Sequence, residues 1–202
     1  MDEVLWERYV QESTAVLRVY RWTPGWLSFG YFQRWTEVAK RLPPGGLAVR
    51  RSTGGGTVDH RSGQTYSLLL PPGHPWTVGR AAQAYIGIHG TLAEILKAEG
   101  IPVDLIQTTT PAHPAGGWCF VDPPVLGDLV HNGLKVAGAA QRRGRCGLLH
   151  QGHLALTTPV WERLASALAD EVTPTQTTKA EEEAAASLAR EKYGTPGWLT
   201  KR

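Results

Sequence analysis

Stretches of β-branched and aromatic residues predict strands in the first third of the chain. Residues 15–22 and 26–32 have this composition, and the Pro-Gly pair between them is typical of a turn. Residues 47–52 predict a third strand. Residues 64–70 alternate between polar and apolar side chains and then become fully apolar, so we expect a half-buried strand there.

Helical periodicity is clearest between residues 78 and 99. Apolar side chains recur there every three or four residues, and Gly100 and Pro102 are expected to end the helix. The apolar positions are Ala81, Ala84, Tyr85, Ile88, Leu92, Ile95 and Leu96. Shorter helices are expected at residues 2–12, 159–172 and 178–194.

The second half of the chain contains the sequence signal of a hairpin. Asn132 and Gly133 are favoured central residues of a type I′ turn, so we predict a hairpin over residues 127–140. Lys135 then lies at the start of its second strand. The other expected elements are strands at 103–107 and 147–156 and a loop at 108–117.

The order of these elements predicts the fold class. Several strands come first, one long helix follows, and more strands and then helices complete the chain. This order lacks the regular alternation of strand and helix that parallel sheets require. We therefore expect an α+β fold with a mixed, largely antiparallel sheet packed against helices. The length of 202 residues fits one domain, over residues 1–202.

Composition narrows the class of protein further. Apolar residues make up 42% of the chain and charged residues 19%, as in ordinary globular proteins. No apolar run approaches the roughly 20 residues of a membrane span, and the acidic N-terminus lacks a signal-peptide core, so no membrane association is expected. The net charge of +3 is not gathered in one run, which disfavours nucleic-acid binding. With two cysteines, we expect a cytoplasmic protein with free thiols.

The glycine motif, residues 50–60 (RRSTGGGTVDH), is the first candidate site. Three glycines let a backbone approach a ligand closely, and their N–H groups can converge on an oxygen atom. Arg50 and Arg51 can add charge-assisted bonds to a phosphate or carboxylate. The spacings of a Walker loop and of a dinucleotide fingerprint are both absent. A flexible turn between two strands explains the motif equally well from local physics.

Lys135 and the two cysteines are the other candidates for chemistry. Small residues follow Lys135 at 137–140 and leave room for a ligand carbonyl or phosphate, although a solvated lysine is the ordinary alternative. Cys119 follows a Pro- and Gly-rich loop, which favours exposure, whereas Cys146 has arginines on its N-terminal side. Either cysteine can equally be a small buried hydrophobe. Local reasoning leaves these alternatives open.

The histidines do not predict a metal site. His150 and His153 lie on an expected strand with odd spacing, so their side chains point to opposite faces and do not share a metal. His60, at the end of the glycine motif, is expected to line a loop or pocket.

Three segments together resemble a known family. They are RRSTGGGTVDH (50–60), GLKVAGAAQRR (133–143) with LLHQG (148–152), and the earlier LRVYRWTPGWLSFGYFQ (17–33). Their order is similar to that of the biotin/lipoate A/B protein ligase superfamily, above all its lipoate-protein ligase and octanoyltransferase branch. The resemblance implies a catalytic domain like those of class II aminoacyl-tRNA synthetases and biotin ligases.

The resemblance also implies an activity and a set of site residues. The activity is transfer of an octanoyl or lipoyl group to a specific lysine of a lipoyl-domain acceptor protein, of the glycine cleavage H protein or 2-oxoacid dehydrogenase E2 type. Cys119 is then the acyl-accepting nucleophile and Lys135 the catalytic cation, with Cys146 as the second choice of nucleophile. The implied substrate-binding residues are Arg50, Arg51, Ser52, Thr53, Gly54, Gly55, Gly56, His60, Gly138 and Ala140.

Members of the branch differ in how the acyl group is activated. A transferase takes it from an acyl carrier protein thioester and needs no cofactor, whereas the alternative, a lipoate-protein ligase or its catalytic subunit, uses ATP and Mg²⁺ and acts through lipoyl-AMP. The triple glycine is closer to the ligase pattern, and Arg61 stands where many members have an Asp. The short stretch after Val172 predicts no C-terminal accessory domain, which favours the transferase or a ligase whose accessory domain is a separate chain. A non-catalytic acyl- or biotin-binding relative is the third reading.

Overall fold

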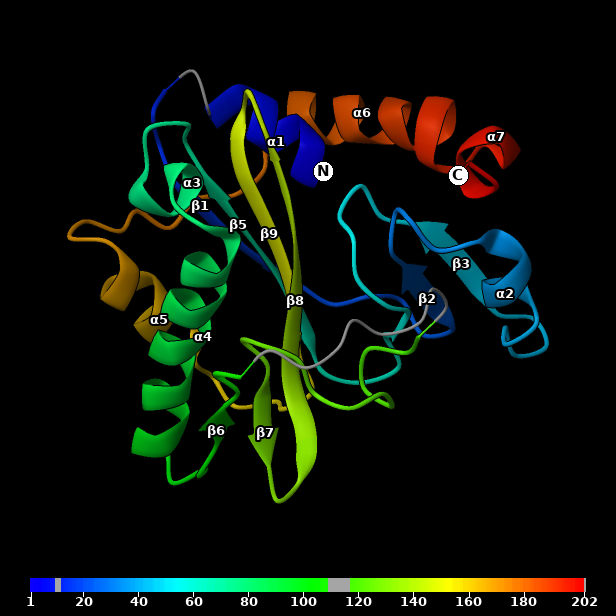
Figure 1. The fold of residues 1–202 in the computed structure, drawn as a ribbon. Coiled ribbons are helices and arrows are strands. Elements are labelled where there is room, and N and C mark those ends of the chain that lie inside the picture. Colours follow the sequence, from blue (N-terminus) through cyan, green and yellow to red (C-terminus); the bar gives the residue numbers. More distant parts are fainter. Residues whose placement is uncertain (10–11, 109–116, 202) are drawn as a thin grey trace.

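The computed structural model describes residues 1–9, 12–108 and 117–201 (Figure 1). Its centre is a six-stranded antiparallel sheet with the strand order β1-β5-β9-β8-β7-β6. The strands are β1 (Val16–Tyr20), β5 (Gln64–Leu70), β6 (Asp104–Leu105), β7 (Leu129–His131), β8 (Leu134–Gly144) and β9 (Gly147–Leu154). Most of the predicted loop at 108–117 lies outside the described residues.

A smaller sheet holds the glycine motif. Its order is β3-β2-β4, with β2 (Trp26–Phe29) between β3 (Leu47–Arg50) and β4 (Val58–Asp59). β2 pairs with β3 in parallel and with β4 in antiparallel orientation. The predicted α+β class with mixed, largely antiparallel pairing is confirmed.

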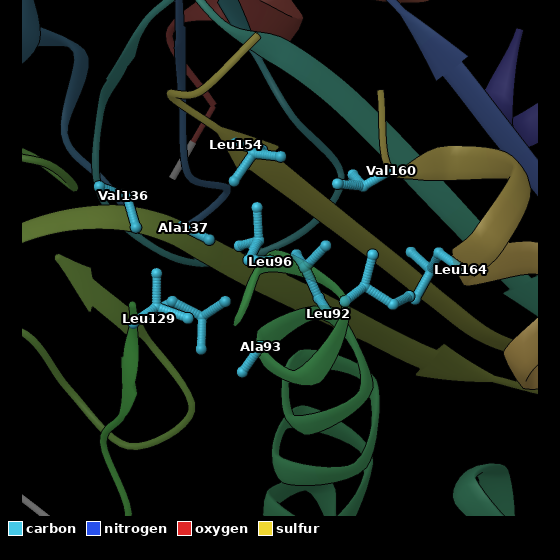
Figure 2. Close-up of a cluster of buried hydrophobic side chains, with 11 residues drawn as sticks. Leu92, Ala93, Leu96, Leu129, Val136, Ala137, Leu154, Val160 and Leu164 are labelled. Carbon is cyan, nitrogen blue, oxygen red and sulfur yellow. The ribbon is translucent and has the colours of Figure 1, made fainter. Parts of the chain in front are cut away.

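Two helices cover one face of the large sheet. These are α4 (Ala81–Ala98) and α5 (Trp161–Leu168). The apolar stripe of α4 packs on β8 and β9, as Figure 2 shows for Leu92 and Leu96 beside Ala137 and Leu154. Burying this cluster on one face leaves the opposite face of the sheet available for a site.

The opposite face is partly covered by the two ends of the chain. α1 (Asp2–Tyr9) packs on it beside Leu69 and Leu149. The C-terminal segment, residues 179–200, comprises α6 (Lys179–Leu188), one π-helical turn (Ala189–Tyr193) and α7 (Pro196–Leu199). Figure 1 shows α6 running from α1 towards α7, which lies above the small sheet.

The expected elements are present, with some differences in extent. The predicted helix at 78–99 begins at Ala81, because a separate turn, α3 (Pro75–Val78), ends at Gly79. The helix predicted at 159–172 is shortened to α5. α2 (Trp35–Ala39), α3, α7 and β4 were not predicted, since such short elements show no periodicity. Within the described residues, no helix has the length and apolarity needed to cross a bilayer.

Candidate active site

A cavity of about 790 Å³ lies between the two sheets. Strands β1, β8 and β9 border it from the large sheet, β2 and β3 border it from the small one, and the C-terminal segment borders a further side. Its apolar lining includes Trp22, Trp26, Trp35, Val49, Val58, Ala140, Leu188 and Leu199. A cavity of this size and lining suits a small ligand with a long apolar part.

Cys119 lines this cavity and is tied to the glycine motif through the backbone. Its N–H donates to the Thr57 carbonyl at 2.8 Å, and the Thr57 N–H donates to the Gly117 carbonyl at 2.9 Å. Thr57 and Trp118 form an isolated parallel bridge. The half-buried thiol is therefore held at a fixed place beside the glycines.

Lys135 forms a buried ion pair next to this cysteine. Its Nζ lies 2.6 Å from Oδ2 of Asp128, and the two side chains are only 6% and 4% exposed. Burial alone would lower the pKa of Lys135, but the Cys119 side chain and the Asp128 carboxylate outweigh burial and raise it. Lys135 therefore carries a full positive charge and interacts with the Cys119 side chain.

A β-bulge in β8 lies beside Lys135. Leu129 of β7 faces Ala137, but the next residue, Val130, faces Lys135, so β8 carries one extra residue here. Such a bulge changes the direction of the side chains around it. Lys135 passes over Gly138 so closely that a Cβ on this glycine would lie 2.5 Å from Lys135 Cε and 2.8 Å from its Nζ.

Gly138→Ala is therefore expected to displace the ammonium of Lys135 and to lower acyl transfer by about a hundred-fold, the loss typical of removing one electrostatic stabiliser. Gly144→Ala on the same strand is the matched control, because its new Cβ would meet only Trp6 at 3.9 Å, an ordinary contact. Initial rates of transfer and thermal unfolding of both variants provide the check. Equal activity of the two variants would show that acyl transfer does not depend on the position of the Lys135 ammonium.

Arg51 organises the glycine motif from within. Its guanidinium donates to Ser28 Oγ at 2.8 Å and to the carbonyls of Gly54 and Gly56 at 3.0 and 2.8 Å. Burial lowers the pKa of Arg51 to about 10, so it remains protonated at neutral pH. Two carbonyls of the motif thus face this guanidinium.

Arg50 is among the residues that line the cavity, and its guanidinium binds backbone carbonyls of three neighbouring residues. Its side chain is fully buried and donates to the carbonyls of Tyr31 at 2.5 Å, Gln33 at 2.8 Å and Leu199 at 2.8 Å. The indole of Trp198 donates back to the Arg50 carbonyl at 2.9 Å. Arg50 therefore fastens the C-terminal segment to the small sheet.

The other residues predicted to bind substrate either line the cavity or lie beside it. Those that line the cavity are Ser52, Gly55, Gly56, His60, Gly138 and Ala140. Thr53 is buried and donates to Gln151 at 2.8 Å. The backbone of Gly54 lies beside Phe32.

Cys146 lies far from the Cys119–Lys135 pair. It sits in the tight turn between β8 and β9 and packs against the cluster of Leu5 and Trp6 on α1. Gly144 lies nine positions after Lys135 on β8, or about 30 Å at 3.3 Å per residue. The structure thus brings Cys119, and not Cys146, to Lys135.

Burial lowers the pKa of His60, His150 and His153, so these three histidines are neutral at pH 7. His60 stacks on Trp22 at 4.2 Å and lies 2.7 Å from Ser28 Oγ, and burial lowers its pKa to about 2. His153 borders the cavity, whereas His150 contacts Tyr66 on the face covered by α4, so their predicted opposite directions are confirmed. In the described part of the chain, no three His, Cys, Asp or Glu side chains gather as metal ligands.

Asp128 is the functional residue that sequence reasoning missed. It directly precedes β7, and Lys135 is the second residue of β8 across the hairpin turn. The predicted turn at Asn132-Gly133 brings an acidic residue on one arm near a basic residue on the other, which was the available signal. Ser28 and Trp22, which hold Arg51 and His60, carried no such signal.

Comparisons with known proteins identify the family of this chain. Residues 1–194 match the family described as the lipoyl protein ligase A/B catalytic domain. Octanoyltransferase LipM of Staphylococcus aureus is 35% identical over 164 residues, and that of Moorella thermoacetica is 31% identical over 167. These matches cover 76% and 77% of this chain. The chain spans only 59% of the length of either relative.

Solved structures show the same fold at low sequence identity. A lipoate-protein ligase A bound with ATP superposes with a TM-score of 0.75 at 17% identity, over 98% of this chain and 91% of that chain. A bipartite lipoate protein ligase of Thermoplasma acidophilum, described with its E2 lipoyl domain, gives 0.61 at 18% identity with the same coverage. The family match over nearly the whole sequence, together with this fold, shows that the chain belongs to the lipoyl protein ligase A/B catalytic-domain family.

Proposed function

We propose that this chain transfers an octanoyl or lipoyl group to a specific lysine of a lipoyl-domain acceptor protein, through a thioester on Cys119. The observation that carries the proposal is that Cys119, which lines the apolar cavity, interacts with the protonated Lys135. The relatives named octanoyltransferases support octanoyl as the transferred group. The ligase described with its E2 lipoyl domain supports a lipoyl domain as the acceptor. The glycine cleavage H protein is the other expected acceptor.

The first half-reaction loads the enzyme from an acyl carrier protein thioester. The Cys119 thiolate attacks the acyl carbonyl, the new C–S bond forms, and the bond to the carrier sulfur breaks. The carrier sulfur leaves as a thiolate, which takes a proton from water. The Lys135 ammonium, held by Asp128, is placed to stabilise the negative charge that develops on the carbonyl oxygen. One thioester replaces another, so no energy source is needed.

The second half-reaction transfers the group to the acceptor. The neutral ε-amine of the acceptor lysine attacks the Cys119 thioester, a C–N bond forms, and the C–S bond breaks. The amine loses one proton and the Cys119 sulfur leaves as a thiolate, so the enzyme returns to its starting state. This division of one acyl transfer into two steps is covalent catalysis.

The arginine of the motif that faces the glycines does not fit the nucleotide of the ligase alternative as it stands. Arg51 donates from both terminal nitrogens to protein oxygens. A phosphate would have to replace these partners. We therefore derive no step through ATP.

A comparison of acyl donors tests the proposal. The wild-type protein is incubated with a lipoyl domain and either octanoyl-acyl carrier protein, or octanoate or lipoate with ATP and Mg²⁺, and the acceptor mass is followed. We expect modification with the carrier thioester alone. Modification that requires ATP would establish the ligase, and failure of both donors would point to a non-catalytic relative.

A further inference from the structure

The C-terminal segment forms a side of the cavity that also contains Cys119. Ala185, Leu188, Ala189 and Leu199 of this segment are among the lining residues. The segment contacts α1 through α6 and β3 through α7, and Figure 1 shows it bridging from α1 to the small sheet. A ligand that fills the cavity therefore contacts residues more than 60 positions away from Cys119 in the sequence.

Specific bonds fix the position of this segment. Lys192 and Tyr193 both bind the Glu3 carboxylate, at 2.7 and 2.5 Å. Further along the segment, Arg50 donates to the Leu199 carbonyl at 2.8 Å. Partners on α1 and on the small sheet hold the segment in place, so it is a fixed boundary of the cavity.

Two alanines and one leucine, from α6 and the π-helical turn that follows it, border the cavity. Ala185, Leu188 and Ala189 are spaced i, i+3 and i+4, so they lie on one face of the helix. Ala189 is exposed although it lines the cavity, which means that its methyl group borders open space. The π-helical turn begins at this residue, and such turns are frequent at functional sites.

We propose that Ala185 and Ala189 determine the size of acyl group that the protein accepts, a proposal that rests on the proposed function. The ligand class is a straight-chain acyl group carried as a thioester. Each methylene that an acyl chain buries strengthens binding about fourfold, so the space left by these two alanines selects between chain lengths. A larger side chain at either position takes space that the end of a longer chain would occupy.

Rates of Cys119 acylation across a series of donors provide the test. Hexanoyl, octanoyl, decanoyl and dodecanoyl thioesters of acyl carrier protein are compared by intact mass for wild type, Ala185→Leu and Ala189→Leu. The ratio of the dodecanoyl to the hexanoyl rate is expected to fall about tenfold or more in both variants, since leucine adds the volume of several methylenes. Leu188→Ala enlarges the cavity and is expected to shift the ratio towards the longer chains.

Ala186→Leu is the matched control. It makes the same change on the same helix at an exposed residue that does not line the cavity, and leucine has almost the helix propensity of alanine. Its donor profile is expected to equal that of wild type. An unchanged profile in both cavity-facing variants, or an equal loss with every donor, overturns the role in selection while the proposed function stands. A wild-type protein that accepts no thioester overturns both.

Discussion

Cys119→Ser is expected to eliminate the octanoyl-enzyme thioester and to slow acyl transfer by at least about a thousand-fold, as loss of a catalytic nucleophile does. The Cys119 side chain interacts with the protonated ammonium of Lys135. A serine hydroxyl keeps the size of the side chain but does not ionise near neutral pH. Intact mass after incubation with octanoyl-acyl carrier protein, followed by the rate of acceptor modification, gives both measurements.

Cys146→Ser is the control for this variant. Its thiol packs beside α1 at the far end of β8 and β9, so the adduct and the rate should equal those of wild type. An adduct that survives in Cys119→Ser but disappears in Cys146→Ser would identify Cys146 as the nucleophile. Full activity of both variants would rule out a cysteine thioester.

Lys135→Met is expected to lower acyl transfer by about a hundred-fold or more, because it removes the cation placed at the reacting carbonyl. The same change leaves the Asp128 carboxylate buried without its partner, since both side chains are nearly inaccessible. Breaking such a pair costs about 3–5 kcal/mol of unfolding free energy. Activity and stability should therefore both fall, for different physical reasons.

The double variant Lys135→Met/Asp128→Asn separates these two effects. An asparagine oxygen can still accept the Val125 N–H that Asp128 accepts at 2.7 Å, and no buried charge remains. Chemical denaturation should show that most of the lost stability returns, while the transfer rate stays low. Recovery of activity together with stability would mean that Lys135 acts only through the fold.

The sequence alone predicts an element correctly where one short segment determines its own structure. Asn132 and Gly133 have φ angles of 50° and 76°, so the type I′ hairpin expected from these two residues is present. The apolar stripe of α4 likewise packs as its helical spacing predicts. The hairpin then placed Lys135 at the start of β8, as expected from the sequence.

Long-range partners explain what the sequence did not reveal. Arg50 lies next to Arg51 in the motif, yet its guanidinium binds carbonyls of residues 198 and 199 at the other end of the chain. No local pattern distinguishes a buried arginine that holds backbone from one that binds a ligand. The C-terminal segment was predicted as a helix by its alanine and glutamate content, but its position at the cavity depends on contacts with α1 and β3.

The central claim is that Cys119 carries the acyl group to the acceptor, and a single-turnover chase tests it most directly. Octanoyl-enzyme is prepared from octanoyl-acyl carrier protein, freed of donor, and mixed with an apo lipoyl domain, while both masses are followed in time. The account predicts that the octanoyl mass leaves the enzyme at the rate at which it appears on the acceptor, at least as fast as steady-state turnover. An adduct that persists while the acceptor remains unmodified would contradict it.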